Sequence, residues 1–187
     1  MSRTHSIHAA AAALGLALLA GCTSTTGDVE SAADAPTAAG ARATLYSPSG
    51  VAMGSAMVEP ISGGLRLTVN GMALPPGPHG AHIHTTGKCD APDFSTAGPH
   101  WNPTAMQHGT MNPAGPHGGD LPNLLIGTDG TGSISIDLPG TMLTGGTNPL
   151  LDADGAALVI HAAADDLKTD PSGNSGGRIA CGVLAAG

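Results

Sequence analysis

Residues 65–69, Leu-Arg-Leu-Thr-Val, alternate apolar and polar side chains, and residues 133–137, Ser-Ile-Ser-Ile-Asp, do the same. Successive side chains of a β-strand point to opposite faces, so this period of two predicts strands with one buried face. Further short strands are predicted at residues 42–47, 51–58, 80–84, 157–162 and 178–184. Seven or eight short strands separated by turn residues, with no convincing helical repeat beyond the N-terminus, predict an all-β antiparallel sandwich or barrel.

Two stretches between these strands are predicted to be long loops. Residues 85–123 and 165–177 are rich in Gly, Pro, Asn and Asp. Both are longer than a typical connection between strands, and loops of that length usually carry function.

Length and charge exclude some classes of protein. The chain has 187 residues, which suits one domain. It carries 6 Lys and Arg against 14 Asp and Glu, a formal net charge of −8. It therefore lacks the basic surface that holds a nucleic-acid backbone, and no nucleic-acid partner is expected.

The N-terminal segment has the pattern of an export signal. Arg3 precedes an apolar run at residues 9–19 that is too short to span a bilayer. Leu19-Ala20-Gly21-Cys22 resembles the bacterial lipobox, in which the signal is cut before a cysteine that then carries lipid. The alternative is an ordinary secretory signal with a chance cysteine.

This pattern divides the chain into three parts. Residues 1–21 are expected to be a lipoprotein signal peptide, residues 22–41 a lipidated flexible tether, and residues 42–187 the folded domain. The protein would lie in the cell envelope or periplasm, attached to a membrane only through the lipid on Cys22. In a cell with two membranes, Thr23 favours the outer one.

Two cysteines remain in the expected domain, Cys89 and Cys181. An even pair in an exported protein is most simply an intramolecular disulfide. The alternative is a pair of free thiols that bind metal.

Histidines fall in a pattern typical of a metal site. His82 and His84 lie two apart in a predicted strand, so both imidazoles point to one face. The first long loop and the end of the 157–162 strand then add His100, His108, His117, Asp120 and His161. Histidine and carboxylate ligands without cysteine suit zinc or copper, and an all-imidazole set favours copper.

Four segments together carry a specific resemblance. They are Gly77-Pro78-His79-Gly80-Ala81-His82-Ile83-His84, the stretch from His100 through His117-Gly118-Gly119-Asp120-Leu121-Pro122, Val159-Ile160-His161, and residues 173–183, Gly-Asn-Ser-Gly-Gly-Arg-Ile-Ala-Cys-Gly-Val. Their order and spacing resemble the copper-zinc superoxide dismutase family over about residues 42–184. The resemblance implies an eight-stranded antiparallel Greek-key β-sandwich with two functional loops.

The resemblance also implies one copper and one zinc per subunit. Copper would be bound by His82, His84, His100 and His161. Zinc would be bound by His100, His108, His117 and Asp120. His100 would then be shared between the two metals as a bridging imidazolate.

Residues beside the metals receive roles from the same resemblance. Asp165 would link one copper-ligand imidazole to one zinc-ligand imidazole and so fix their orientation. Arg178 would attract the superoxide anion, with help from Lys168, and His100 would pass a proton to the nascent peroxide. Cys89 and Cys181 match the family disulfide, and a structural role is expected for His79.

The function implied is dismutation of superoxide to O2 and H2O2, which would protect the cell envelope. The alternative is a non-catalytic periplasmic protein that binds or carries copper or zinc. Such a carrier would need neither Arg178 nor a bridging histidine, so both features favour the enzyme. A monomer and a homodimer remain equally open.

Overall fold

A computed structural model describes residues 40–187 as an antiparallel β-structure. In this range the strands are β1 (Ala41–Tyr46), β2 (Ala52–Ile61), β3 (Gly64–Gly71), β4 (Gly77–His79), β5 (Ala81–His84), β6 (Leu124–Ile126), β7 (Gly132–Pro139), β8 (Ala156–His161) and β9 (Arg178–Ala186). A single 3-10 turn, Ser95–Ala97, accompanies them. Within residues 40–187, no helix is long and apolar enough to cross a membrane. The predicted signal peptide, the lipidated Cys22 and the tether lie outside the described residues, except that β1 already begins at Ala41.

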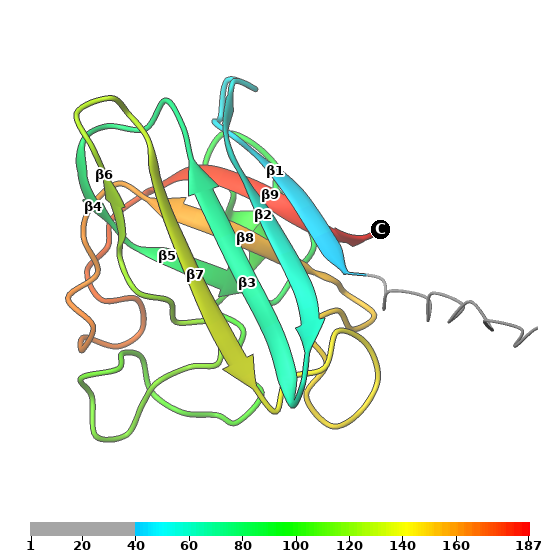
Figure 1. Ribbon diagram of the computed structural model, residues 1–187. Helices are drawn as coiled ribbons and strands as arrows, with labels where there is room; N and C mark the ends of the chain where they lie inside the picture. The colour runs from blue at the N-terminus through cyan, green and yellow to red at the C-terminus, as the bar shows by residue number, and fades with distance from the viewer. Residues whose placement is uncertain (1–39) are drawn as a thin grey trace, which may run out of the picture. The chain divides into compact units, whose positions relative to one another are not determined.

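Seven strands form one curled sheet in the order β5-β8-β9-β1-β2-β3-β7, and β4 pairs with β6. In Figure 1, β1, β2, β3 and β7 lie in front of β9, β8 and β5, so the curled sheet makes two layers. The neighbours β3-β7 and β5-β8 are far apart in sequence, so long connections cross between the layers. The all-β class is confirmed.

The two alternating stretches that predict the fold pair with each other. Leu67 of β3 lies opposite Ile136 of β7, and Val69 lies opposite Ile134. Leu67 and Val69 are fully buried, whereas Arg66 is exposed and pairs with Asp137 across the strands at 2.7 Å. The period of two therefore divides core from solvent as expected, with Leu65, Leu67 and Val69 among the main core residues.

The strands β5 and β8 are buried on both faces. One face packs against the main core, and the candidate site lies on the other. Ile83 and Ile160 point into the main core between the layers. The alternate residues point the other way, where Val159 packs with Phe94 beneath the first long loop. Since side chains alternate along a strand, the histidines of β5 also lie on this second face.

Nine strands are present in residues 40–187, one more than the predicted eight-stranded sandwich. The short strands β4 and β6, three residues each, pair only with each other and were missed by period-two patterning. A three-residue strand is too short to display alternation, and β4 contains Pro78, which favours a turn in sequence. The predicted loop 85–123 ends where β6 begins.

Candidate metal centre

Four buried histidines converge on the face of β5 and β8 that is turned away from the core. His82 and His84 come from β5, and His161 ends β8. His100 lies in the first long loop, where its backbone forms an isolated β-bridge with His84. One nitrogen of each ring is buried without a hydrogen-bond partner: His82 Nδ1, His84 Nε2, His100 Nε2 and His161 Nε2. One ligand atom from each ring lies within 4.8 Å of the others. Nitrogens bonded to one metal at about 2 Å lie at most about 4 Å apart, so this set has to draw slightly inward to close around one cation.

The second ring nitrogen fixes three of these imidazoles. Nδ1 of His84 donates to the Gly98 carbonyl at 2.8 Å, and Nδ1 of His161 donates to the Gly176 carbonyl at 3.1 Å. His82 Nε2 lies 2.7 Å from the Asp165 carboxylate. A nitrogen that donates leaves the other with its lone pair free, so these contacts select the tautomers in which the lone pairs face one another.

Burial keeps three of the four rings, those of His84, His161 and His100, neutral. Burial, with smaller contributions from neighbouring histidines and Arg178, lowers the pKa of His84 from 6.5 to about 2. Burial likewise lowers the pKa of His161 to about 3 and of His100 to about 4. These three neutral imidazoles at physiological pH are ready-made nitrogen ligands.

A second cluster surrounds one oxygen of Asp120. Its Oδ1 lies 2.9 Å from His100 Nδ1, 3.0 Å from His108 Nδ1 and 3.3 Å from His117 Nδ1. The Nδ1 atoms of His117 and His100 are 3.4 Å apart. Tetrahedral zinc with bonds of about 2.0–2.1 Å separates its ligands by about 3.3–3.4 Å. The distances from Asp120 Oδ1 to the three nitrogens, and the distance between His100 and His117, are therefore close to those of a zinc tetrahedron.

The backbone holds the carboxylate of Asp120 in place. Its Oδ2 accepts the N–H of Gly109 at 2.8 Å and the N–H of His117 at 2.9 Å. Burial alone would raise the pKa of Asp120, but the contacts with His100 and these backbone donors lower it well below its usual range. Asp120 is therefore ionised and supplies a negative charge to the cluster.

His100 belongs to both clusters. Its Nδ1 lies against Asp120, and its Nε2 is one of the four partnerless nitrogens of the first cluster. Only a ring with both nitrogens engaged in this way can bridge two metals, as the sequence resemblance implies for this residue.

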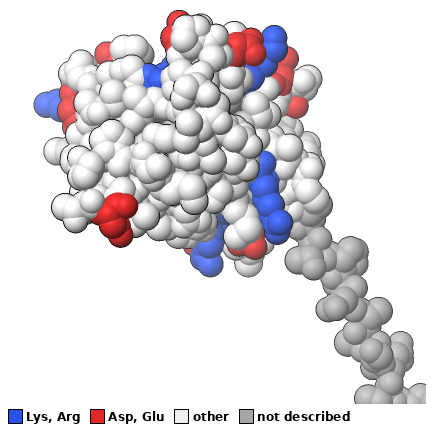
Figure 2. Space-filling model, turned by 90° about the horizontal axis from the view of Figure 1, so that it is seen from above, with Lys and Arg blue, Asp and Glu red and all other residues white. Residues whose placement is uncertain are grey.

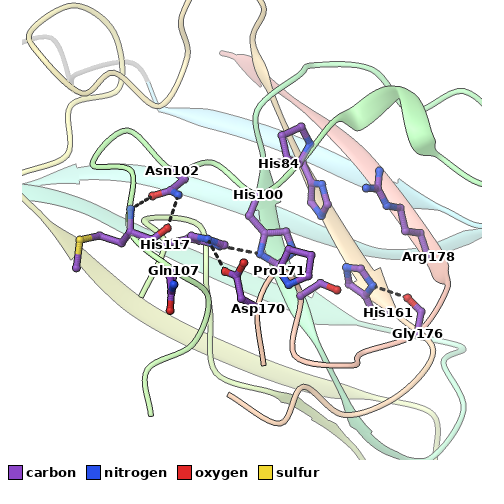
Figure 3. A pocket seen from close by; sticks show the side chains of 13 residues that line it. His84, His100, Asn102, Gln107, His117, His161, Asp170, Pro171, Gly176 and Arg178 are labelled. Atoms are coloured by element: carbon purple, nitrogen blue, oxygen red, sulfur yellow. Dashed lines mark hydrogen bonds and ion pairs between the residues drawn. The ribbon is translucent and has the colours of Figure 1, made fainter. Parts of the chain in front are cut away.

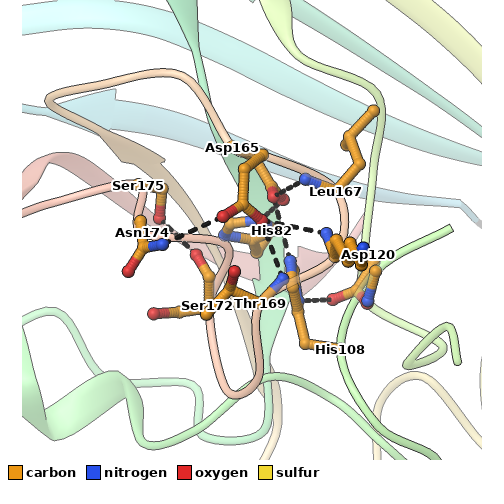
Figure 4. A network of polar contacts seen from close by, with 12 residues as sticks. His82, His108, Asp120, Asp165, Leu167, Thr169, Ser172, Asn174 and Ser175 are labelled. Carbon is orange, nitrogen blue, oxygen red and sulfur yellow. Dashed lines mark hydrogen bonds and ion pairs between the residues drawn. The ribbon is translucent and has the colours of Figure 1, made fainter. Parts of the chain in front are cut away.

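Asp165 contacts one histidine of each cluster (Figure 4). Its Oδ2 lies 2.7 Å from His82 Nε2, and its Oδ1 lies 3.0 Å from His108 Nε2. All three side chains are fully buried. One carboxylate thus fixes a ring in each cluster.

A cavity of about 580 Å³ leads from solvent to the first cluster. Figure 3 shows Arg178 beside His84 and His161 in its wall. The Arg178 guanidinium donates to the carbonyls of Phe94, at 2.6 Å, and Gly98, at 2.8 Å. These bonds leave a half-buried cation at the cavity, since an arginine side chain stays protonated.

The cavity also contains an acid, Asp170, and Lys168 does not line it. Asp170 Oδ1 accepts the N–H of His108 at 2.6 Å and lies 3.7 Å from His117 Nε2. On the face seen in Figure 2, charged side chains are few and lie apart on a mostly uncharged surface. A steering role for Lys168 therefore has no support from its position, and Arg178 is the cation that lines the cavity.

Two further sequence expectations concern residues near the clusters. Cys89 and Cys181 form a disulfide, which confirms the predicted pairing and excludes free thiols as metal ligands. His79 is buried, and both of its ring nitrogens lie 2.8 Å from carbonyl oxygens, those of His161 and Pro75. Neither nitrogen of His79 is free to face the clusters.

Comparison with known proteins decides the family. Residues 52–184 match the family described as copper/zinc superoxide dismutase. The chain belongs to this family. Superoxide dismutase 1 [Cu-Zn] of Aquifex aeolicus is 42% identical over 146 residues, which cover 76% of this chain and 85% of that protein. The [Cu-Zn] superoxide dismutase of Caulobacter vibrioides is 41% identical over 147 residues, 77% of this chain and 84% of that one.

A solved structure gives the same result for the fold. The crystal structure of a superoxide dismutase-like protein from Bacillus subtilis matches with a TM-score of 0.74 and 42% identity, covering 79% of this chain and all of that one. The Greek-key β-barrel expected from the sequence is therefore confirmed. As a member of the copper/zinc superoxide dismutase family the chain is an oxidoreductase that dismutes superoxide, with copper and zinc as cofactors.

The structure brings every predicted site residue of the domain into one region, and it adds groups that sequence reasoning missed. These are the carbonyls of Phe94, Gly98 and Gly176, the N–H groups of Gly109 and His117, and the side chain of Asp170. Backbone groups leave no signature in residue type, so no pattern could have revealed them. Asp170 lies in the predicted 165–177 loop, but one acid among several gave no signal.

Proposed function

We propose that His82, His84, His100 and His161 hold the catalytic copper of this superoxide dismutase. The observation that carries the assignment is the set of four buried nitrogens without a partner, His82 Nδ1 and the Nε2 atoms of the other three. A buried nitrogen left without a partner is costly, and four of them facing one another would be strongly unfavourable unless a cation satisfied them.

Zinc is assigned to the cluster around Asp120, with His100, His108 and His117 as the other ligands. Three imidazoles and one carboxylate in a near-tetrahedral arrangement match a closed zinc site. The charge also fits, because the ionised Asp120 offsets part of the charge of a divalent cation.

Copper bound in this site would supply one-electron redox chemistry, accepting an electron from one superoxide and giving one to the next. The chain supplies position, charge and protons. His100 Nδ1 is held at Asp120, so Nε2 is the atom of this ring that can carry a proton on the cavity side. Arg178, fixed by two carbonyls, attracts the superoxide anion into the cavity.

The location of the protein is proposed from the N-terminal sequence. Arg3, the apolar run at residues 9–19 and the small residues before Cys22 support export, cleavage and lipidation. The enzyme would then act in the cell envelope and protect it from superoxide. Cys22→Ser should move the protein from the membrane fraction to the soluble fraction; unchanged membrane association would contradict lipid anchoring through Cys22.

The decisive experiment separates an enzyme from a metal carrier. Purified protein is analysed for copper and zinc, and superoxide consumption is measured with and without cyanide. We expect one copper and one zinc per chain and cyanide-sensitive turnover. Both metals bound without turnover would favour the carrier, and the absence of copper would contradict the assignment of the four histidines.

A further inference from the structure

We infer that Gly173 is a positioning residue for the zinc cluster, because only a glycine there lets Asp165 reach His108. Asp165 Oδ1 lies 3.0 Å from His108 Nε2, in full burial. Gly173 lies directly over this contact. A Cβ built on Gly173 would overlap Asp165 Oδ1 and would lie 2.7 Å from His108 Nε2. Two of the three nearest atoms are the two ends of this one contact, and the third is Asp165 Cγ at 2.5 Å.

The backbone cannot easily move Gly173 away. Its N–H donates to the Thr169 carbonyl at 2.6 Å, and its own carbonyl accepts the N–H of Asp166 at 2.8 Å. Its φ of +63° lies in the left-handed region, where a side chain is also strained. A substitution must therefore displace the carboxylate or the turn that carries it.

The carboxylate has little freedom to retreat and still serve both rings. Asp165 Oδ1 also accepts the N–H of Leu167 at 2.6 Å, while Oδ2 is engaged by His82 at 2.7 Å. A Cβ at position 173 meets Oδ1 and not Oδ2 among its nearest atoms. The contact with His108 should therefore be lost before the contact with His82, and the zinc side should weaken more than the copper side.

This inference rests on the proposed role of His108 as a zinc ligand. Outer partners of metal-ligating histidines are worth about 10–100-fold in metal affinity. We therefore expect Gly173→Ala to lower zinc affinity by about 10–100-fold in the full-length chain. The measurement is competition for zinc with a chelator of known affinity, which does not depend on enzymatic activity. Copper affinity, measured in the same way, should change less.

Gly145→Ala is the matched control. Gly145 has a φ of +69°, close to that of Gly173, but a Cβ there would meet no atom within 4 Å. Both variants therefore carry the same backbone strain, and only one carries the clash. If Gly145→Ala lowers zinc affinity as much as Gly173→Ala, the effect is general strain and the inference is wrong.

A double variant tests whether Gly173 acts through Asp165. Adding Gly173→Ala to Asp165→Ala should lower zinc affinity by a smaller factor than Gly173→Ala does in the parent chain, because the contact with Asp165 is already gone and only the 2.7 Å approach to His108 Nε2 remains. Additive losses would overturn the inference. If Gly173→Ala alone fails to fold, folding of the double variant supports the clash with Asp165, and failure of both contradicts it.

His108→Ala separates this inference from the ligand assignment. If His108→Ala leaves zinc affinity unchanged, the proposed zinc ligand set is wrong. If His108→Ala abolishes zinc binding while Gly173→Ala binds zinc like the parent protein, the ligand set stands and the inference about Gly173 fails.

Discussion

The proposed copper cluster and the proposed zinc cluster differ in what holds their ligands. Three of the four histidines in the first cluster lie on the paired strands β5 and β8, buried against the core on their other face. The second cluster lies entirely in the first long loop, within residues 100–120. Strand ligands are fixed by the sheet, whereas loop ligands depend on the loop's own hydrogen bonds and on Asp165 of the second loop.

The two clusters also differ in charge. The first contains buried imidazoles whose inward nitrogens have no partner, whereas the second contains the ionised Asp120 in contact with three imidazoles. Without metal, the first cluster is left with unsatisfied nitrogens and the second is partly satisfied by its own anion. The fold thus supplies geometry to one metal and both geometry and charge to the other.

The largest effect is expected when a strand ligand is removed. His161→Ala should abolish copper binding while zinc is retained. Superoxide turnover should fall by more than about 100-fold, because loss of a hydrogen-bond partner of a metal ligand already costs about 10–100-fold. Metal content per chain and superoxide consumption test this. Loss of zinc before copper would contradict the division of ligands.

Removal of the Asp120 carboxylate should weaken zinc binding and leave copper binding intact, the reverse of His161→Ala. Asp120→Ala deletes the charge and the atom shared by three imidazoles, so zinc affinity should fall by more than about 100-fold while copper remains bound. Titration with Co(II) in place of zinc, followed by visible absorption, reports the site directly. Equal loss of both metals would show that the clusters are not separable.

Arg178→Ala should leave both metals bound and act on the substrate. Charge steering in a cleft changes association rates by about 10- to 1000-fold, so kcat/KM should fall at least about 10-fold at low ionic strength, and less at high salt. Arg66→Ala is the matched control, because Arg66 is exposed and paired with Asp137 on β7. An unchanged kcat/KM in Arg178→Ala would remove this residue from the mechanism.

Acid should destabilise the metal-free protein through the first cluster. Burial lowers the pKa of His84 to about 2, of His161 to about 3 and of His100 to about 4, below the ordinary 6.5. The unfolded chain therefore binds more protons below pH 6.5, and folding stability falls as the pH drops from about 6.5 to 4. Each group contributes at most about 1.4 kcal/mol per pH unit.

The Asp120 carboxylate should not contribute in this pH window. The pKa of Asp120 is lowered, so its contribution is present above its ordinary value of 3.8 and is lost only in stronger acid. Denaturant unfolding of metal-free protein at pH 7 and pH 5, followed by fluorescence of the sole tryptophan, Trp101, measures the difference. Equal stability at the two pH values would contradict the burial of neutral imidazoles.

The sequence predicted most of the strands because their signal is local. Alternation in residues 65–69 and 133–137 identified β3 and β7, but nothing in either stretch indicated that they pair with each other. Pairing depends on long-range packing that a period of two does not encode. The short strands β4 and β6 were not predicted, because three residues are too few to show an alternation of apolar and polar side chains.

The candidate ligands could be named from the sequence because residue type carries metal chemistry. The spacing of His82 and His84 placed both rings on one face, and the family resemblance supplied the remaining assignments. What the sequence could not supply was the set of contacts that select ring tautomers, such as the Gly176 carbonyl on His161. It also gave no reason to expect that Asp170 lines the cavity with Arg178.

The carbonyl oxygen of Gly98 accepts two hydrogen bonds, one from His84 Nδ1 and one from Arg178. A single backbone atom thus positions both a proposed copper ligand and the cation that we propose attracts the substrate. Displacement of the peptide group at Gly98 would shift the His84 imidazole and the Arg178 guanidinium together. Variation near residue 98 should therefore produce correlated losses of copper geometry and of salt-dependent rate, rather than a loss of either property alone.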